Sequence, residues 1–304
     1  MQDLSSKYSP QREGDWGVPS AAPGSQYSTE FVPCPDDVKL FMRSWRTADP
    51  ASPVLVMLHG LGAHTGWFID MGNALNAFGL NVYMYDHRGF GRSDGARGHV
   101  DRAAVLFDDA AHVLRSVSHR HPGARIFVLG HSMGALLATN VAVRDAESSE
   151  SAVTGLIVVN PWIRDVVKVS PAFVFRSIAA GMRGSSKVMH RPSDTALMTL
   201  NADATRLLAN DPNWVKNQTA AFLYQITRVR LAVMKLARSV NVPTLVIQCL
   251  GDATVSHDAS RKFFDAIAAS DKEWKTYDGF GHDFEFERDR AVLDTDIARW
   301  IARH

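Results

Sequence analysis

The segment Gly130-His131-Ser132-Met133-Gly134 contains a serine with a glycine two residues away on each side. It follows an apolar run that indicates a strand and precedes a stretch that indicates a helix, ALLATNVAV. A serine in a sharp strand-to-helix turn exposes its hydroxyl, and the glycines, Gly130 and Gly134, allow the chain to make that turn. The N-terminus of the following helix favours negative charge that develops there. We therefore expect Ser132 to be a nucleophile; the alternative is a turn in which the serine only caps the helix.

A serine hydroxyl needs a general base, and two residues later in the chain could complete that arrangement. Asp252 follows the apolar run TLVIQCL, and His282 lies in the loop after the last expected strand. Side chains at the carboxyl ends of parallel strands gather at one edge of the sheet. His282 would take the serine proton and return it to the leaving group, while Asp252 would fix the imidazole tautomer.

Four neighbouring groups are weaker candidates for the base and the acid. His257 stands where a helix should begin. Asp278 and Asp283 are loop acids, which we expect to be solvated or to cap. His131 adjoins the serine, but its side chain should point away from it.

The segment His59-Gly60-Leu61-Gly62 follows the apolar run VLVML. Acyl transfer creates an oxyanion that preorganised backbone N–H groups can stabilise. One donor would be the N–H of Met133, the residue after the nucleophile, and the other would be the N–H of Leu61. The glycines would let the backbone approach the substrate, and His59 would support the loop.

The glycine and histidine patterns do not indicate a cofactor or a metal ion. Thr65 stands where a dinucleotide-binding fingerprint that starts at Gly60 and Gly62 needs its third glycine. The chain has no G-x-x-x-x-G-K-[ST] phosphate loop and no H-E-x-x-H. His119 and His121 lie in a polar loop, where a solvated pair is expected. We expect neither a metal nor a cofactor.

Short apolar runs alternate with stretches of helical period, which is typical of a parallel sheet covered by helices on both faces. The expected strands lie at 54–58, 81–85, 126–129, 156–159, 244–250 and 274–277, after two extended segments joined by a turn at 35–37. The expected helices lie at 67–78, 101–119, 132–144 and 289–302. Asp101 is a candidate N-cap of the second helix. These elements predict an α/β fold with a mostly parallel central sheet.

The alternation stops between Pro161 and Val240, where no strand is expected. Helical patterns at 172–180, 196–210 and 220–239 indicate a helical cap inserted into the sheet domain. The predicted organisation is a flexible leader at 1–28, a core formed by 29–160 and 241–304, and a cap at 161–240.

Composition excludes several classes of protein. Lys and Arg number 33 and Asp and Glu 32, so a net charge of +1 gives no reason to expect nucleic acid as a partner. Cys34 and Cys249 are expected to be free thiols, with one long-range disulfide as the alternative. No run of 18 apolar residues and no secretory signal is present, so we expect a cytoplasmic protein.

The segments LHGLGAH, YDHRGFGRSDG, GHSMGA, LGD and GFGH resemble those of α/β-hydrolases in the monoacylglycerol lipase and lysophospholipase group, a family of serine aminopeptidase S33 type. The resemblance runs from about Phe31 to the C-terminus and implies a helical cap. It also implies that Asp86, Arg88 and the pair Ser93-Asp94 form a buried polar network that braces the oxyanion loop, with a tight surface turn as the alternative. His64 would support the same loop.

The expected reaction is hydrolysis of a carboxylic ester through an acyl-enzyme, on a substrate with a single fatty or medium-length acyl chain, as in a monoacylglycerol. Alternatives with the same three residues are a small-substrate carboxylesterase, a thioesterase, a haloperoxidase, an aminopeptidase and a C–C bond hydrolase. A non-catalytic binding protein is an alternative of a different class. An aminopeptidase would need acids in the cap, for which the candidates are Asp165, Asp194, Asp203 and Asp211.

An apolar stretch at 166–178 opens the expected cap and also contains Lys168 and Arg176. Packing against the core is the preferred interpretation. The alternatives are that it lines an acyl tunnel or makes transient contact with a lipid surface. The oligomeric state is left open.

Overall fold

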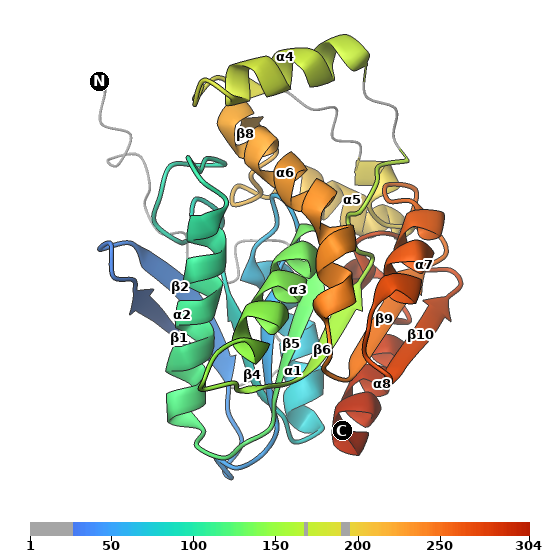
Figure 1. Cartoon of the computed structure of the whole chain (residues 1–304). Helices are drawn as coiled ribbons and strands as arrows, with labels where there is room; N and C mark the ends of the chain where they lie inside the picture. The colour runs from blue at the N-terminus through green and yellow to red at the C-terminus, as the bar shows by residue number, and fades with distance from the viewer. Residues whose placement is uncertain (1–26, 167–169, 190–194) are drawn as a thin grey trace.

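The computed structural model describes residues 27–166, 170–189 and 195–304. An eight-stranded sheet with the order β1-β2-β4-β3-β5-β6-β9-β10 forms its centre (Figure 1). The pairs β1–β2 and β2–β4 are antiparallel and the others are parallel. The predicted mostly parallel sheet is therefore confirmed. The strands are β1 (Ser28–Pro33), β2 (Lys39–Trp45), β3 (Val54–Leu58), β4 (Asn81–Tyr85), β5 (Ile126–His131), β6 (Val153–Val159), β9 (Thr244–Cys249) and β10 (Lys272–Tyr277).

Helices cover both faces of this sheet, and alternate residues of each central strand face opposite helix layers. In β3, Val54, Val56 and Leu58 join one apolar cluster, while Leu55 and Met57 join the other. This is why the central strands are mostly apolar on both faces. The first cluster includes α2 (Ala104–Arg120), α3 (Met133–Ala146) and α7 (His257–Ala266), and the second includes η2 (Thr65–Phe68), α1 (Ile69–Ala77) and α8 (Arg290–Arg303).

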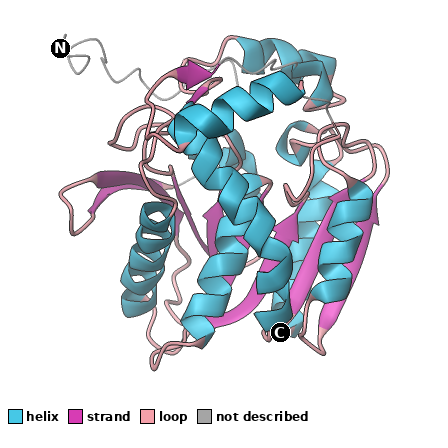
Figure 2. Cartoon of the chain, turned by 45° about the horizontal axis from the view of Figure 1, so that its top comes forward, coloured by secondary structure: helices cyan, strands magenta, loops and turns pink. Residues whose placement is uncertain are grey.

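The cap inserts between β6 and β9. It contains α4 (Pro171–Gly181), η3 (Thr195–Leu197), α5 (Ala202–Ala209), α6 (Ala220–Leu236) and η4 (Ala237–Ser239). Figure 1 shows α4 at the top of the molecule and α6 running down beside α3, and Figure 2 shows α4 and α6 in contact. The prediction of a cap without strands is wrong, because β7 (Val188–Met189) pairs with β8 (Gln218–Thr219). Two-residue strands are too short to leave a periodic pattern in the sequence.

Two local predictions are corrected by contacts from distant elements. Asp101 does not cap α2, which begins at Ala104; instead, Gln225 of the cap accepts the Ala103 N–H at 3.4 Å and donates to the Asp101 carbonyl at 3.0 Å. His121 is not solvated, because it is buried and hydrogen-bonds to Tyr83 Oη at 2.7 Å. Neither partner is near in sequence.

Several remaining predictions concern single features. Both cysteines are free and buried. None of the described helices combines the length and apolar character needed to cross a bilayer. The predicted leader lies almost wholly outside the described residues, as do Lys168 of the apolar cap stretch and the candidate acid Asp194.

Candidate active site

Ser132 lies in a strained turn between β5 and α3. Its φ and ψ are 54° and −114°, a region that non-glycine residues rarely occupy. Close packing explains the flanking glycines: a Cβ on Gly130 would collide with Gly134 O, and a Cβ on Gly134 would collide with Leu58 O. The tight crossing of β5, α3 and the end of β3 therefore forces the serine outward.

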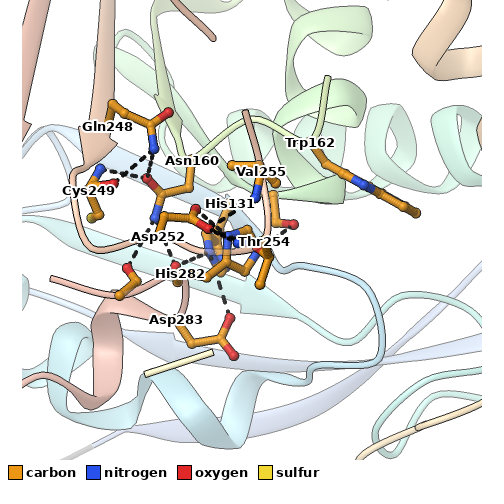
Figure 3. A network of polar contacts seen from close by, with 12 residues as sticks. His131, Asn160, Trp162, Gln248, Cys249, Asp252, Thr254, Val255, His282 and Asp283 are labelled. Carbon is orange, nitrogen blue, oxygen red and sulfur yellow. Dashed lines mark hydrogen bonds and ion pairs between the residues drawn. The ribbon is translucent and has the colours of Figure 1, made fainter. Parts of the chain in front are cut away.

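Three loops at the carboxyl edge of the sheet bring Ser132, His282 and Asp252 into one hydrogen-bonded chain. Figure 3 shows His282 beside Asp252 in this chain. His282 Nε2 is 2.9 Å from Ser132 Oγ, and His282 Nδ1 is 2.6 Å from Asp252 Oδ2. The other Asp252 oxygen, Oδ1, accepts from Thr254 N at 2.7 Å, Thr254 Oγ1 at 2.9 Å and Val255 N at 3.1 Å. The carboxylate is thus fixed on one side, and its free oxygen orients the imidazole.

The two titratable groups shift each other's pKa toward the charged pair. Burial by itself raises the pKa of Asp252, but the charge and hydrogen bond of His282 outweigh it and the pKa falls below its usual value. Burial lowers the pKa of His282, and the Asp252 charge and hydrogen bond more than offset this, so its pKa is raised. The site therefore favours an imidazolium at His282 when the serine gives up its proton.

The N–H groups of Leu61 and Met133 remain available beside this serine. Met133 is the first residue of α3, whose N–H has no acceptor within the helix. In the described parts of the chain, no protein oxygen accepts a hydrogen bond from either N–H. The Leu61 loop also lies against Ser132, since a Cβ on Gly60 would be 3.2 Å from Ser132 Cβ. Both donors can therefore serve an oxyanion at Ser132.

His59 supports this loop through a second buried histidine. His59 Nδ1 donates to Gly60 O at 2.8 Å, while its Nε2 accepts from His87 N at 2.9 Å. His87 Nε2 donates back to His59 O at 3.0 Å. Burial lowers the pKa of His59 to about 3, so its Nε2 stays available as an acceptor.

His64 ties the loop to the cap. Its Nδ1 accepts from Gly66 N at 3.0 Å, and its Nε2 donates to Asp211 Oδ2 at 2.8 Å. Trp67 Nε1 donates to the same oxygen at 2.5 Å. Burial raises the pKa of Asp211, but the bonds from His64 and Trp67 outweigh it and the pKa is lowered. A second link is made by Gly62 O, which accepts from Val215 N at 3.0 Å.

The network predicted around Asp86 is partly corrected. Asp86 is buried and accepts from Thr65 N at 2.6 Å and Arg92 N at 2.7 Å, while Ser93 Oγ donates to its carbonyl. Arg88, however, does not brace the oxyanion loop. It binds Asp109 of α2 at 2.7 and 2.9 Å and also Asp36, because its side chain leaves the turn on the side that faces α2 and the β1–β2 turn.

The sequence did not identify Asn160, although Asn160 holds the loop that carries His282, called here the histidine loop (Figure 3). It follows β6 with φ of 45°, and its Nδ2 donates to His282 O at 2.8 Å. Its Oδ1 accepts from Cys249 N at 2.7 Å and Gln248 Nε2 at 3.2 Å. An asparagine at a strand end, before a proline, is the one signal that the sequence offered.

Glu287 was also missed. Its Oε1 accepts from Gly281 N at 3.0 Å in the histidine loop and from Thr199 Oγ1 and Leu200 N of the cap at 2.9 and 2.8 Å. The carboxylate thus fixes the histidine loop against the cap. No local sequence pattern indicates this contact, because the cap residues that bind Glu287 lie far from it in the sequence.

One neighbour of His282 differs from prediction, and a second packs against its ring. Asp283 is buried rather than solvated, and burial raises its pKa to about 7. His131 packs its ring 5.0 Å from that of His282 and donates from Nε2 to His282 O at 2.9 Å. His131, His282 and Asp283 have ligand atoms within 4.8 Å of one another. Both nitrogens of His282 are engaged by Ser132 and Asp252, so this grouping does not offer a free metal-binding donor set.

A pocket of about 200 Å³ opens above Ser132. Its lining is mostly apolar and comes from the Leu61 loop, the cap and the loop that carries Asp252: Leu61, Trp162, Leu197, Met198, Trp214, Val215 and Val255. Asp165 also lines it but is engaged, since Trp162 Nε1 donates to it at 2.6 Å and Arg230 pairs with it at 2.8 Å. The arrangement can transfer an acyl group from an apolar substrate to Ser132 Oγ.

A protein-family profile described as serine aminopeptidase, S33, matches residues 49–289, which is most of the chain. The chain belongs to the serine aminopeptidase S33 family. The order of its strands in the central sheet and its inserted cap agree with the α/β-hydrolase fold.

Named relatives are similar over nearly the whole chain. The human monoglyceride lipase is 25% identical over 277 residues, covering 88% of this chain and 88% of the relative. The monoacylglycerol lipase of Mycolicibacterium smegmatis is 26% identical over 279 residues, covering 88% and 94%. A soluble variant of the monoglyceride lipase of Saccharomyces cerevisiae, solved with a substrate analogue, has the same fold: TM-score 0.80, 20% identity, with 92% and 96% of the chains covered.

Proposed function

We propose that this chain is a serine hydrolase that cleaves carboxylic esters through an acyl-enzyme on Ser132. The observation that carries the proposal is the unbroken hydrogen-bonded chain from Ser132 Oγ through His282 to Asp252, at the base of an apolar pocket. The similarity to monoglyceride and monoacylglycerol lipases supports the same reaction class.

In this mechanism, Ser132 Oγ attacks the ester carbonyl carbon while His282 Nε2 takes the hydroxyl proton. The oxyanion that forms accepts from the N–H groups of Leu61 and Met133. The bond from carbon to the alcohol oxygen then breaks, and His282 gives the proton to that oxygen. Water, activated by the same imidazole, attacks the acyl-enzyme, releases the carboxylic acid and restores Ser132.

The proposed substrate class is a single acyl chain on a small alcohol, as in a monoacylglycerol. A mostly apolar pocket suits an acyl chain, and a volume of about 200 Å³ suits one chain better than several. The printed names of the relatives point to the same class. A small-substrate carboxylesterase is the alternative that differs only in acyl length.

An aminopeptidase is less well supported. Its pocket would need a free carboxylate for the ammonium of the substrate. Asp165 lines the pocket but is already paired with Arg230, and Asp211 is buried under His64 and Trp67. Asp203 is exposed and bonds to Arg206 on the outer side of α5. None of these three acids is placed to receive a substrate amine.

The test is a series of p-nitrophenyl esters from acetyl to palmitoyl, with Ser132→Ala as the control. Because Ser132 is in a turn fixed by backbone packing, the alanine variant should keep its circular dichroism spectrum and lose nearly all turnover. A serine-dependent optimum at medium or long chains supports the lipase-like assignment. An active Ser132→Ala protein would refute the acyl-enzyme, and an acetyl or butyryl optimum would indicate the small-substrate alternative.

We also propose that α4 touches lipid surfaces when the substrate is membrane-borne. Phe175 is 73% exposed, Met182 68% and Val174 42%, and Arg176 is exposed on the same helix. An apolar, partly basic outer face suits an interfacial helix. Vesicle co-sedimentation should weaken for Val174→Ser, and further for Phe175→Ser with Met182→Ser, but not for Val292→Ser, the same valine change at an exposed site on α8. Equal binding of all three proteins would contradict this contact.

A further inference from the structure

A second pocket lies between α2, α3 and the cap helix α6, away from Ser132. Its volume is about 590 Å³, which exceeds the roughly 200 Å³ above the serine. The two pockets share no lining residue. Ligand sites in proteins span about 300–1,000 Å³, so this pocket has the size of a ligand site. Its walls are mostly the three helices, with Arg102 and Ala103 before α2 and Ser239 after α6 completing the lining.

The floor of this pocket is apolar and rigid. Phe107, Leu136 and Val233 line it and are 7%, 1% and 1% exposed, and Val229 and Leu236 extend the same surface along α6. These side chains belong to the main apolar cluster of the molecule. The floor therefore offers a fixed apolar surface that an aliphatic chain would remove from water.

Three cations stand around this apolar floor. Arg102 precedes α2, while Arg228 and Lys235 project from α6, and all three are exposed. No Asp or Glu occurs among the described residues that line the pocket. Within the described parts of the chain, none of the three cations forms an ion pair with a carboxylate. With a net charge of only +1 for the whole chain, this local excess of positive charge is a feature of the site.

Two amides add polar capacity at the pocket wall. The amide of Gln225 is already engaged, because it bridges Asp101 O and Ala103 N and so holds α6 against the start of α2. The Oδ1 atom of Asn140 remains available, because it is buried and has no hydrogen-bond partner in the described structure. Since the oxygen and nitrogen of an amide exchange places on a 180° rotation, Asn140 can also present N–H donors to a ligand.

We propose that this pocket binds the anion of a single-chain fatty acid, with its alkyl chain on the floor and its carboxylate at the cationic rim. An apolar floor with an unneutralised cationic rim matches an amphiphile with one negative head. A neutral amphiphile would leave the three cations unpaired. The inference goes beyond the proposed hydrolysis, and it is independent of which bond Ser132 cleaves.

The first test maps the bound ligand on the full-length protein. A diazirine-bearing palmitate is photo-crosslinked, and the labelled peptides are identified by mass spectrometry. We expect label on the segments 102–107 and 225–239, and protection by excess dodecanoate but not by dodecanol. Label confined to the residues above Ser132 would overturn the proposal. Equal protection by dodecanol would overturn the anionic head, and much stronger protection by dodecyl phosphate would overturn the carboxylate.

The second test reverses the rim charge. Arg228→Glu with Lys235→Glu should weaken dodecanoate binding, measured by calorimetry, at least ten-fold, which corresponds to about 1.4 kcal/mol. Arg115→Glu with Arg238→Glu is the matched control, because both residues are exposed and neither lines the pocket. Equal loss in both variants would show a general charge effect and refute the site. Hydrolysis by the rim variant tests the proposed function separately, since no rim residue touches Ser132.

Discussion

Replacing Asp252 by asparagine should inactivate the chain more completely than replacing it by alanine. In the structure, Asp252 Oδ1 accepts three hydrogen bonds from Thr254 and Val255, and only Oδ2 faces His282. An asparagine must keep its single oxygen on the side of the three donors. Its NH₂ group then faces His282 Nδ1.

The size of this bias follows from the bonds. Turning the amide over would lose three accepted hydrogen bonds of about 1 kcal/mol each and would set donors against donors. The orientation in which the NH₂ group faces His282 is thus favoured over the turned one by about 3 kcal/mol, or roughly a hundred-fold. His282 must then carry its proton on Nε2, where it cannot accept the proton of Ser132. Loss of imidazolium stabilisation adds to this, and about 10⁴-fold in turnover is the expected total.

The assay is the steady-state turnover of the best p-nitrophenyl ester, with circular dichroism to establish folding. Asp252→Ala carries no NH₂ group, so the tautomer is not forced and about ten-fold more activity should remain than in Asp252→Asn. The reasoning is wrong if the asparagine variant keeps more than about a tenth of wild-type turnover. It is also wrong if a folded Asp252→Asn protein is more active than Asp252→Ala.

Three further predictions concern pH and stability. Because Asp252 raises the pKa of His282 above 6.5 and the base must be neutral, activity should fall on acidification with a midpoint above 6.5; a kcat/KM profile from pH 5 to 9 checks this. Asn160→Ala should lower the free energy of unfolding by about 2–4 kcal/mol, since Cys249 N loses its acceptor and alanine is strained at positive φ. Urea titration should place Asn160→Gly in between, and an unchanged alanine variant would contradict the bond. Buried Asp294 has a pKa raised to about 7 from 3.8, so its ionisation lowers stability as pH rises through that window. Asp294→Asn should therefore raise the Tm more at pH 8 than at pH 5, and an equal gain at both values would refute this.

Much of the fold could be predicted from the sequence because its signals are local. A strand buried on both faces is mostly apolar, so Val54–Leu58 and Asn81–Tyr85 were placed with their observed bounds. The cap was less predictable: β7 and β8 are only two residues long, and the start of α2 is set by Gln225 from another part of the chain.

The grouping of Ser132, Asp252 and His282 at one edge was also expected from the sequence, since each follows a strand of a parallel sheet. The direction of individual side chains was not. Arg88 was expected at the oxyanion loop but turns to Asp36 and Asp109. Asp283 was expected in solvent but is buried.

The sequence by itself determined the order of strands and helices and the turn that exposes Ser132, because backbone periodicity and glycine positions are local properties. The tertiary structure alone decided which distant groups hold that site in place. His64 meets Asp211, and Glu287 meets Gly281 and Thr199, only because folding brings the cap onto the sheet edge. A hydrogen bond depends on distances of a few tenths of an ångström between elements far apart in sequence. No local pattern encodes such a distance.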